Sequence, residues 1–224
     1  MNPTTESIQT ASNPQPSEDI WVYVWNLTSD GVGHTGIQVG DTYMSIHPGR
    51  VPAVGPTIVF PLPAILASKL TDDMESEAAA SRKDTVDPDS FYCGVASDTP
   101  LDQKAPDRIY RVAGLDTAAM RKTMRQVEAG VESDNISYQL VPRINALSFF
   151  KELPAYLSQD PVDMTLTREQ PSQKQRGAVY NCATLVDHLL QAGGMRPVPH
   201  SRIPWEPTPN AIADHVEESG FRPT

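Results

Sequence analysis

Residues 180–194 read YNCATLVDHLLQAGG, and this stretch predicts one short helix with a cysteine in its first turn. Asn181 is a favourable N-cap residue, because its side-chain oxygen can accept a hydrogen bond from a free backbone N–H of the first turn. Gly193 is expected to end the helix, since glycine adopts positive φ without strain. We interpret the rest of the chain around this predicted helix.

The apolar positions of the helix recur at i, i+3, i+4 and i+7, which is the spacing of one buried face. They are Cys182, Leu185, Val186 and Leu189. Cys182 is therefore expected at the buried edge of the first turn, where the helix dipole and free N–H groups favour the nucleophilic thiolate. An inert core cysteine would show the same pattern, so the helix alone leaves both interpretations open.

The composition limits the classes of function. A chain of 224 residues is long enough for one substantial core or at most two small domains. Its net charge of −10 argues against nucleic acid or an anionic membrane surface as the main partner. No apolar run is long enough to span a bilayer. We predict a disordered leader over residues 1–19, which are polar and rich in Pro, Ser and Thr, and a single domain over residues 20–224.

The two cysteines and the polar start of the chain bear on its compartment. Cys93 and Cys182 are too few for a disulfide framework or a zinc-knuckle pattern. No metal or cofactor is expected. Cys93 is expected to have a packing role. The first twenty residues lack the pattern of a Sec-type signal peptide. We therefore expect synthesis in the cytoplasm, and any export would need a specialised secretion system.

A β-hairpin is predicted over residues 34–47. Residues 34–39 and 42–47 alternate between apolar and polar side chains, and Gly40-Asp41 is a recognised two-residue connection. A two-residue loop fixes the register, so that residues whose numbers sum to 81 lie opposite each other. Ile37 is then paired with Met44 on an apolar face that belongs to the core.

The same register places His34 opposite His47 on the polar face of the hairpin. Directly opposed residues have Cβ atoms about 4.5–5.5 Å apart. His34 is the better candidate for a general base, and His47 could orient it, because a base needs a second group to fix its tautomer. Ser45, two residues back on the same face, is the alternative orienting group.

Further elements are predicted more coarsely. Strands are expected at 20–27, 57–60, 91–95, 108–112 and 138–141. Helices are expected within 64–82, at 117–129, over part of 144–157 and at 210–219. Gly130 and Gly220 are the expected stops of the helices that precede them. Tyr43 and Trp205 are the candidate substrate-binding aromatics, although Trp205 equally fits a role in covering the core.

Two short stretches together resemble a known group of enzymes. They are Gly33-His34-Thr35-Gly36-Ile37 and Tyr180-Asn181-Cys182-Ala183-Thr184-Leu185-Val186. The pair resembles the circularly permuted branch of the papain-like cysteine hydrolases, in which the histidine strand precedes the cysteine helix. This branch includes permuted NlpC-type peptidases, the lecithin:retinol acyltransferase family and the PPPDE de-conjugating peptidases. The resemblance covers about thirty residues.

The resemblance implies a fold, a set of roles and an activity. It implies an α+β fold with an antiparallel sheet packed against helices, and the nucleophile at a helix N-terminus. Cys182 would be the nucleophile, His34 the base and His47 the third group, while Asn181 and the Cys182 N–H would stabilise an oxyanion. Ala183 and Leu185 differ from the asparagine and aromatic residue usual in the de-conjugating relatives, and the membrane anchor of the acyltransferases is absent.

Three functions follow from these expectations. The first is a cysteine peptidase or amidase, with the stem peptides of bacterial peptidoglycan as substrate, delivered as a toxin-like effector and countered by an immunity or inhibitor protein. The second is an isopeptidase acting on ubiquitin-like conjugates, or an acyltransferase. The third is a non-catalytic binding module on the same fold, in which Cys182 is a core residue.

Overall fold

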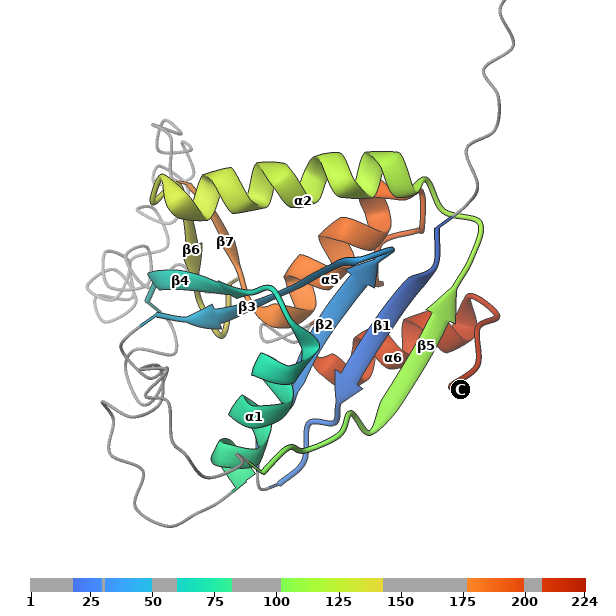
Figure 1. Ribbon diagram of the computed structural model, residues 1–224, viewed down its shortest axis with the longest axis horizontal. Coiled ribbons are helices and arrows are strands. Elements are labelled where there is room, and N and C mark those ends of the chain that lie inside the picture. The colour runs from blue at the N-terminus through green and yellow to red at the C-terminus, as the bar shows by residue number, and fades with distance from the viewer. Residues whose placement is uncertain (1–17, 30, 50–59, 82–101, 143–176, 200–206) are drawn as a thin grey trace, which may run out of the picture.

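The computed structural model describes residues 18–29, 31–49, 60–81, 102–142, 177–199 and 207–224 (Figure 1). These residues form an α+β structure with one mixed sheet of seven strands and four helices. The strands are β1 (Ile20–Trp25), β2 (His34–Val39), β3 (Thr42–Pro48), β4 (Leu62–Ala67), β5 (Arg108–Val112), β6 (Ile136–Tyr138) and β7 (Ala178–Tyr180). The helices are α1 (Leu70–Ser81), α2 (Thr117–Glu132), α5 (Cys182–Ala192) and α6 (Pro209–Glu218). The predicted α+β class is therefore confirmed.

The sheet has the strand order β5-β1-β2-β3-β4-β6-β7. Neighbouring strands are antiparallel except β6 and β7, which run parallel. The sheet is thus mixed, whereas we predicted an antiparallel one. β7 pairs with β6 at the end of the sheet and leads through Asn181 into α5.

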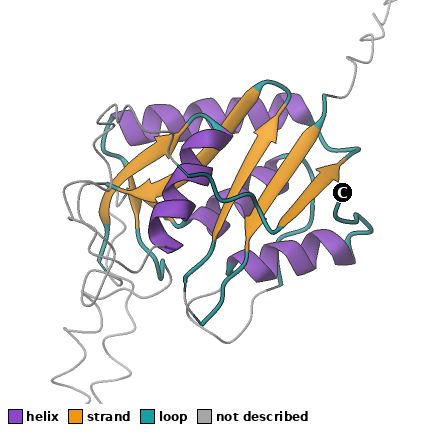
Figure 2. Cartoon of the chain, turned by 60° about the horizontal axis from the view of Figure 1, so that its bottom comes forward, coloured by secondary structure: helices purple, strands orange, loops and turns teal. Residues whose placement is uncertain are grey.

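Helices cover both faces of the sheet (Figures 1 and 2). Apolar side chains of α2, α5 and α6 share the main core with one face of β1, β2, β3 and β5. On the other face, partly buried Leu70 and Met74 of α1 pack against a smaller cluster that includes Tyr23, Trp25 and Tyr43. The face of the hairpin that we predicted to be polar is therefore covered by α1.

The predicted register of the hairpin is confirmed where β2 and β3 pair. Ile37 lies opposite Met44, and Gln38 lies opposite Tyr43. Gly40 has a φ of +58°, as expected for glycine in the first position of a tight two-residue turn. Ile37 and Met44 are both buried in the main core, so the apolar face of the hairpin is also as predicted.

The segment before α1 forms a strand that we did not predict. The helix expected within residues 64–82 is confirmed as α1, which begins at Leu70, but the chain ahead of it forms β4 up to Ala67. β4 pairs with β3, with Ser45 opposite Ala67 and His47 opposite Ile65. This long-range pairing overrides the local helical preference of an alanine- and leucine-containing stretch.

Two of the glycines predicted to stop helices do not act as expected. α2 continues past Gly130 to Glu132, and a Cβ at Gly130 would lie 2.5 Å from Cδ1 of Ile136. Gly130 therefore allows β6 to approach the helix closely. At the end of α5, Gly193 keeps a right-handed φ of −79°, and it is Gly194 that adopts a positive φ of +98°.

The remaining predicted elements have mixed outcomes. β1, β5 and α6 match the predicted strands and last helix, and Gly220 follows α6 with a φ of +96°. β6 lies earlier than the predicted 138–141 strand, since it ends at Tyr138. The leader up to residue 17, residues 57–59, the strand at 91–95 with Cys93, the helix at 144–157 and Trp205 lie outside the described residues. None of the helices in the described ranges has the length and apolar character needed to cross a membrane.

Candidate active site

Cys182 is the first residue of α5 and is 6% exposed. The helix begins where predicted, because the side chain of Asn181 accepts a hydrogen bond of 2.7 Å from the N–H of Thr184. The hydroxyl of Thr184 in turn accepts a bond of 2.8 Å from the N–H of Asn181, which completes a capping box. This reciprocal pair fixes the position of Cys182 at the start of the helix.

Asn181 is committed to structural bonds. Its side-chain amide donates to the carbonyl of Leu140 at 3.0 Å, and its backbone N–H donates to Thr184. The predicted use of Asn181 as an oxyanion donor would compete with these bonds. The backbone N–H of Cys182, in the first turn of α5, has no partner within the helix and remains the donor that the geometry favours.

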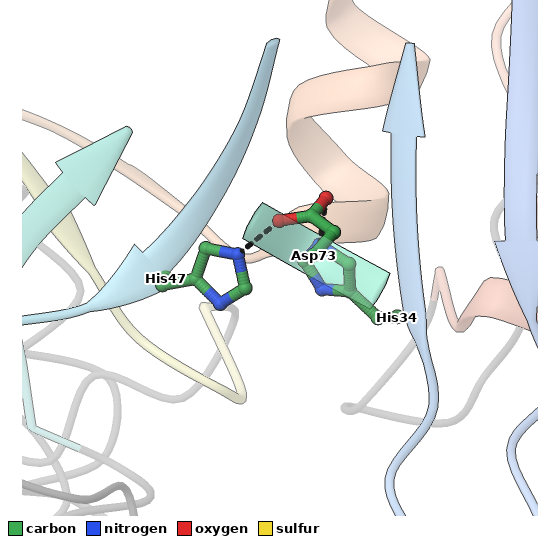
Figure 3. Close-up of side chains that lie close together, drawn as sticks. All are labelled: His34, His47 and Asp73. Carbon is green, nitrogen blue, oxygen red and sulfur yellow. Dashed lines mark hydrogen bonds and ion pairs between the residues drawn. The ribbon is translucent and has the colours of Figure 1, made fainter. Parts of the chain in front are cut away.

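His34 is the first residue of β2 and binds a buried carboxylate that we did not predict (Figure 3). Its Nε2 lies 2.9 Å from Oδ2 of Asp73, a residue of the first turn of α1. His34 is 4% exposed and Asp73 is fully buried. The group that orients His34 is therefore carried by the helix that covers this face of the sheet.

Four side chains converge on the carboxylate of Asp73. Besides His34, the hydroxyl of Tyr43 donates to Oδ2, and the hydroxyl of Ser45 donates to Oδ1 at 2.9 Å. Nε2 of His47 lies 2.6 Å from Oδ1 (Figure 3). Both oxygens therefore have two partners, which is how a fully buried carboxylate can remain ionised.

The two histidine rings are stacked beside Asp73. Their centroids are 4.4 Å apart and their planes differ by 22°. The ring of Trp25 packs against His34 with a centroid distance of 5.7 Å. Ser45 Oγ lies 3.3 Å from Nε2 of His47. Predicted site residues His34, His47, Ser45 and Tyr43 thus lie together, with Asp73 as the common partner.

The charges of His34 and Asp73 stabilise each other. Burial alone lowers the pKa of His34, but the charge of Asp73, together with charge and hydrogen-bond interactions with Cys182, holds this pKa well above its usual value. Burial raises the pKa of Asp73, but the interactions with His34 and His47 outweigh it and hold that pKa far below its usual range. Both shifts favour the ion-pair form of these two groups, in which His34 is protonated and Asp73 is ionised.

The interaction with Cys182 connects the histidine network on α1's side of the sheet to the start of α5. Because Nε2 of His34 is bound to Asp73, Nδ1 is the ring nitrogen left for the thiol. The thiol, the imidazole and the carboxylate come from three different elements, α5, β2 and α1.

Glu77 lies one turn beyond Asp73 on α1. Burial raises its pKa, although the positive charges of His34, Lys104 and His47 oppose this shift.

His34, His47 and Asp73 also offer the types of ligand atom that bind metal ions. One ligand atom each of His34, His47 and Asp73 lie within 4.8 Å of one another. A metal ion binds an imidazole nitrogen close to the ring plane, about 2.0–2.1 Å away. The two rings are stacked and only 22° from parallel, so an ion in the plane of one ring lies outside the plane of the other. The arrangement fits a hydrogen-bonded network better than a shared metal ion.

Asp73 is the residue that sequence reasoning missed. It belongs to the acidic run Asp72-Asp73-Met74-Glu75-Ser76-Glu77, in which nothing marks one carboxylate as buried. The polar face of the hairpin, with two histidines, a serine and a tyrosine, was a signal that something charged would cover it. Of the two predicted substrate-binding aromatics, Tyr43 is 6% exposed and bound to Asp73, and Trp205 lies outside the described residues.

Comparisons with protein-family models, with curated proteins and with solved structures found no match for this chain.

Proposed function

We propose that the protein is a cysteine hydrolase that cleaves an amide bond. Cys182 is the nucleophile, His34 transfers protons, and Asp73 orients His34. The observation that carries the proposal is that Nε2 of His34 is held 2.9 Å from the fully buried carboxylate of Asp73, while Cys182 helps to raise the pKa of His34. A nucleophile, a base in contact with it and a third group that orients the base together make up the machinery of nucleophilic catalysis.

In this proposal Asp73 takes the orienting role predicted for His47 or Ser45. Asp73 fixes the tautomer and the ring position of His34, as a carboxylate does behind a catalytic histidine. His47 and Ser45 bind the other carboxylate oxygen, Oδ1, at 2.6 and 2.9 Å. They support the carboxylate, and His47 also stacks on the ring of His34.

The reaction follows from the charged form of the site. With the thiol proton on His34, the Cys182 thiolate attacks the amide carbonyl carbon, and the oxyanion is stabilised by the Cys182 N–H. The C–N bond breaks as His34 gives its proton to the leaving amine, which leaves a thioester on Cys182. Water then attacks the thioester, His34 takes its proton, and cleavage of the C–S bond releases the acid and restores the cysteine.

For the fold and substrate, we propose a circularly permuted papain-like hydrolase of the NlpC type that acts on peptidoglycan stem peptides. A histidine on an early strand and a cysteine at the start of a late helix support this assignment. Delivery as a secreted effector and an immunity protein as partner belong to the same proposal. Digestion of purified peptidoglycan should release new free amines with the native protein and none with Cys182→Ala.

The other enzymatic branches predict different products. Trapping of Cys182 by a ubiquitin-type electrophilic probe, without new amines from peptidoglycan, would favour an isopeptidase. Transfer of a fatty acyl group to an amine would favour an acyltransferase.

The second candidate is a non-catalytic binding module. It is favoured by the 6% exposure of Cys182 and by its packing in the main core cluster. In that case Cys182→Ala would lower stability, and the native thiol would react no faster than an ordinary buried cysteine.

The deciding experiment is alkylation of Cys182 by iodoacetamide at pH 6, followed by mass spectrometry of the Cys182 peptide. An ordinary cysteine, with a pKa near 8.5, is almost entirely a thiol at this pH, so replacing His34 with alanine should slow alkylation on the order of 100-fold. His188→Ala is the matched control, since His188 lies on the same helix but is exposed. Equal rates in the native protein and His34→Ala would rule out the proposed pair.

A further inference from the structure

Tyr43 lies within the site without facing solvent. It is a β3 residue opposite Gln38, its side chain is 6% exposed, and its hydroxyl donates to Oδ2 of Asp73. This is the oxygen that also binds Nε2 of His34. Tyr43 and His34 therefore approach the same carboxylate oxygen from neighbouring strands. A buried tyrosine engaged in this way has no free hydroxyl to offer a substrate.

Gly36, two residues after His34 on β2, makes room for this contact. A Cβ built on Gly36 would lie 2.6 Å from Cζ of Tyr43 and closer still to its hydroxyl. Gly36 is not among the described glycines with positive φ, so its backbone conformation is open to other residues. The requirement for glycine at position 36 is therefore one of clearance: the phenol ring crosses β2 directly above it.

We propose that Tyr43 is a positioning residue, which holds the Asp73 carboxylate in place for His34, and that Gly36 is the clearance that allows it. This inference rests on the proposed function, because it concerns the same thiol, imidazole and carboxylate. It replaces the substrate-binding role predicted for Tyr43. Tyr43 acts through Asp73 and His34 and does not itself touch the thiol or a substrate.

The physical effect of Tyr43 is to keep Asp73 ionised and its Oδ2 fixed. Burial, followed by the charge of Asp73, raises the pKa of Tyr43, so that the phenol remains a donor at every pH of interest. A donor that cannot deprotonate stabilises the carboxylate and so keeps the proton on His34. The other titratable groups that interact with Tyr43 or Asp73 are Tyr23, His34, His47 and Glu77. Lys104 in turn interacts with Glu77.

The test compares two tyrosines on the same face of the sheet. Tyr43→Phe removes the hydroxyl bound to Asp73, whereas Tyr23→Phe removes one that donates to Gln38 at 2.9 Å. The readout is the rate of Cys182 alkylation by iodoacetamide from pH 5 to pH 8. Tyr43→Phe should lower the rate at pH 6 about tenfold, from the loss of one hydrogen bond to a charged group. As the pH is lowered from 8 to 5, the alkylation rate of Tyr43→Phe should begin to fall at a higher pH than the rate of the native protein. Tyr23→Phe should leave the profile unchanged.

Gly36→Ala provides a second, independent variant. Its new methyl group displaces the Tyr43 hydroxyl while every polar group of the site is retained, so it should reproduce the profile of Tyr43→Phe. Both variants remove the same hydrogen bond, from the Tyr43 hydroxyl to Asp73. The double variant should therefore alkylate at nearly the same rate as either single variant.

The inference is overturned if Tyr43→Phe and Gly36→Ala, folded as judged by circular dichroism, alkylate as the native protein does at every pH. It is also overturned if Tyr23→Phe lowers the rate as strongly as Tyr43→Phe, since a general packing effect would then account for both. Neither result touches the proposed function, which fails only if alkylation in the native protein is independent of His34.

Discussion

Replacing Asp73 with asparagine should reverse the pH dependence of stability in this protein. The Asp73 side chain is fully buried and accepts from His34, Tyr43, Ser45 and His47. An asparagine has a similar shape but no charge, and its amide nitrogen faces donors that bound a carboxylate oxygen. Breaking a buried, hydrogen-bonded charge pair by removing one partner costs about 3–5 kcal/mol. We expect the free energy of unfolding of Asp73→Asn to fall by about this amount at pH 6.

The sign of the pH effect follows from the shifted pKa of His34. In the native protein this pKa is raised above the unfolded value near 6.5, so the stabilisation is fully present below that pH and is lost as the pH rises. Between pH 6.5 and 8 the loss from this one group is at most about 2 kcal/mol. In Asp73→Asn burial dominates and lowers the pKa of His34, so acidification through pH 6.5 destabilises the fold.

The lowered pKa of Asp73 makes stability depend on pH in the acidic range as well. Its contribution to stability is present above the unfolded value near 3.9 and is lost as the pH falls toward the folded pKa. The paired charges of His34 and Asp73 are therefore most stabilising between about pH 4 and 6.5.

Urea unfolding at pH 6 and pH 8, analysed by linear extrapolation, measures these changes. The matched control is Asp72→Asn, at the neighbouring exposed aspartate of the same helical turn. The reasoning is refuted if Asp73→Asn keeps the pH dependence of the native protein, or if Asp72→Asn changes it as much.

Three further outcomes are expected. His47→Ala should slow Cys182 alkylation about tenfold, less than His34→Ala, because His47 binds the far oxygen of Asp73 and stacks on the ring of His34. Equal losses would show that both histidines serve the thiol directly. Asn181→Ala should cost about 0.5–2 kcal/mol of stability and also slow alkylation, since it loosens the start of α5, whereas Thr208→Ala, which uncaps α6, should lower stability alone. Amide cleavage should survive incubation with a chelator and be abolished by iodoacetamide; the opposite pattern would point to a metal ion held by His34, His47 and Asp73.

Local signals in the sequence were sufficient for several elements. Asn181 and the spacing of Cys182 and Leu185 predicted α5 and its cap, because capping and helical periodicity depend on neighbours within one or two turns. Gly40-Asp41 predicted the hairpin register, since a two-residue turn leaves no freedom in how its strands pair.

Elements that depend on distant partners were not predictable in the same way. Residues 62–67 form β4 because they pair with β3, and a stretch with helical preference takes the conformation that its partner strand requires. Gly130 was expected to end α2 but provides space for Ile136 of β6. In both cases the deciding contact lies outside the local sequence window.

The candidate site also has parts that local sequence signals predict and a part that depends on long-range contacts. The sequence by itself determined that Cys182 begins a helix, that His34 and His47 belong to one hairpin, and that Ser45 and Tyr43 share their face, because these follow from helical and strand periodicity. Only the tertiary structure decided that Asp73, from an acidic run with no distinguishing mark, lies buried beneath that face and binds all four side chains. The physical reason is that a carboxylate can be buried only where enough donors converge on it, and this convergence comes from packing α1 on the sheet.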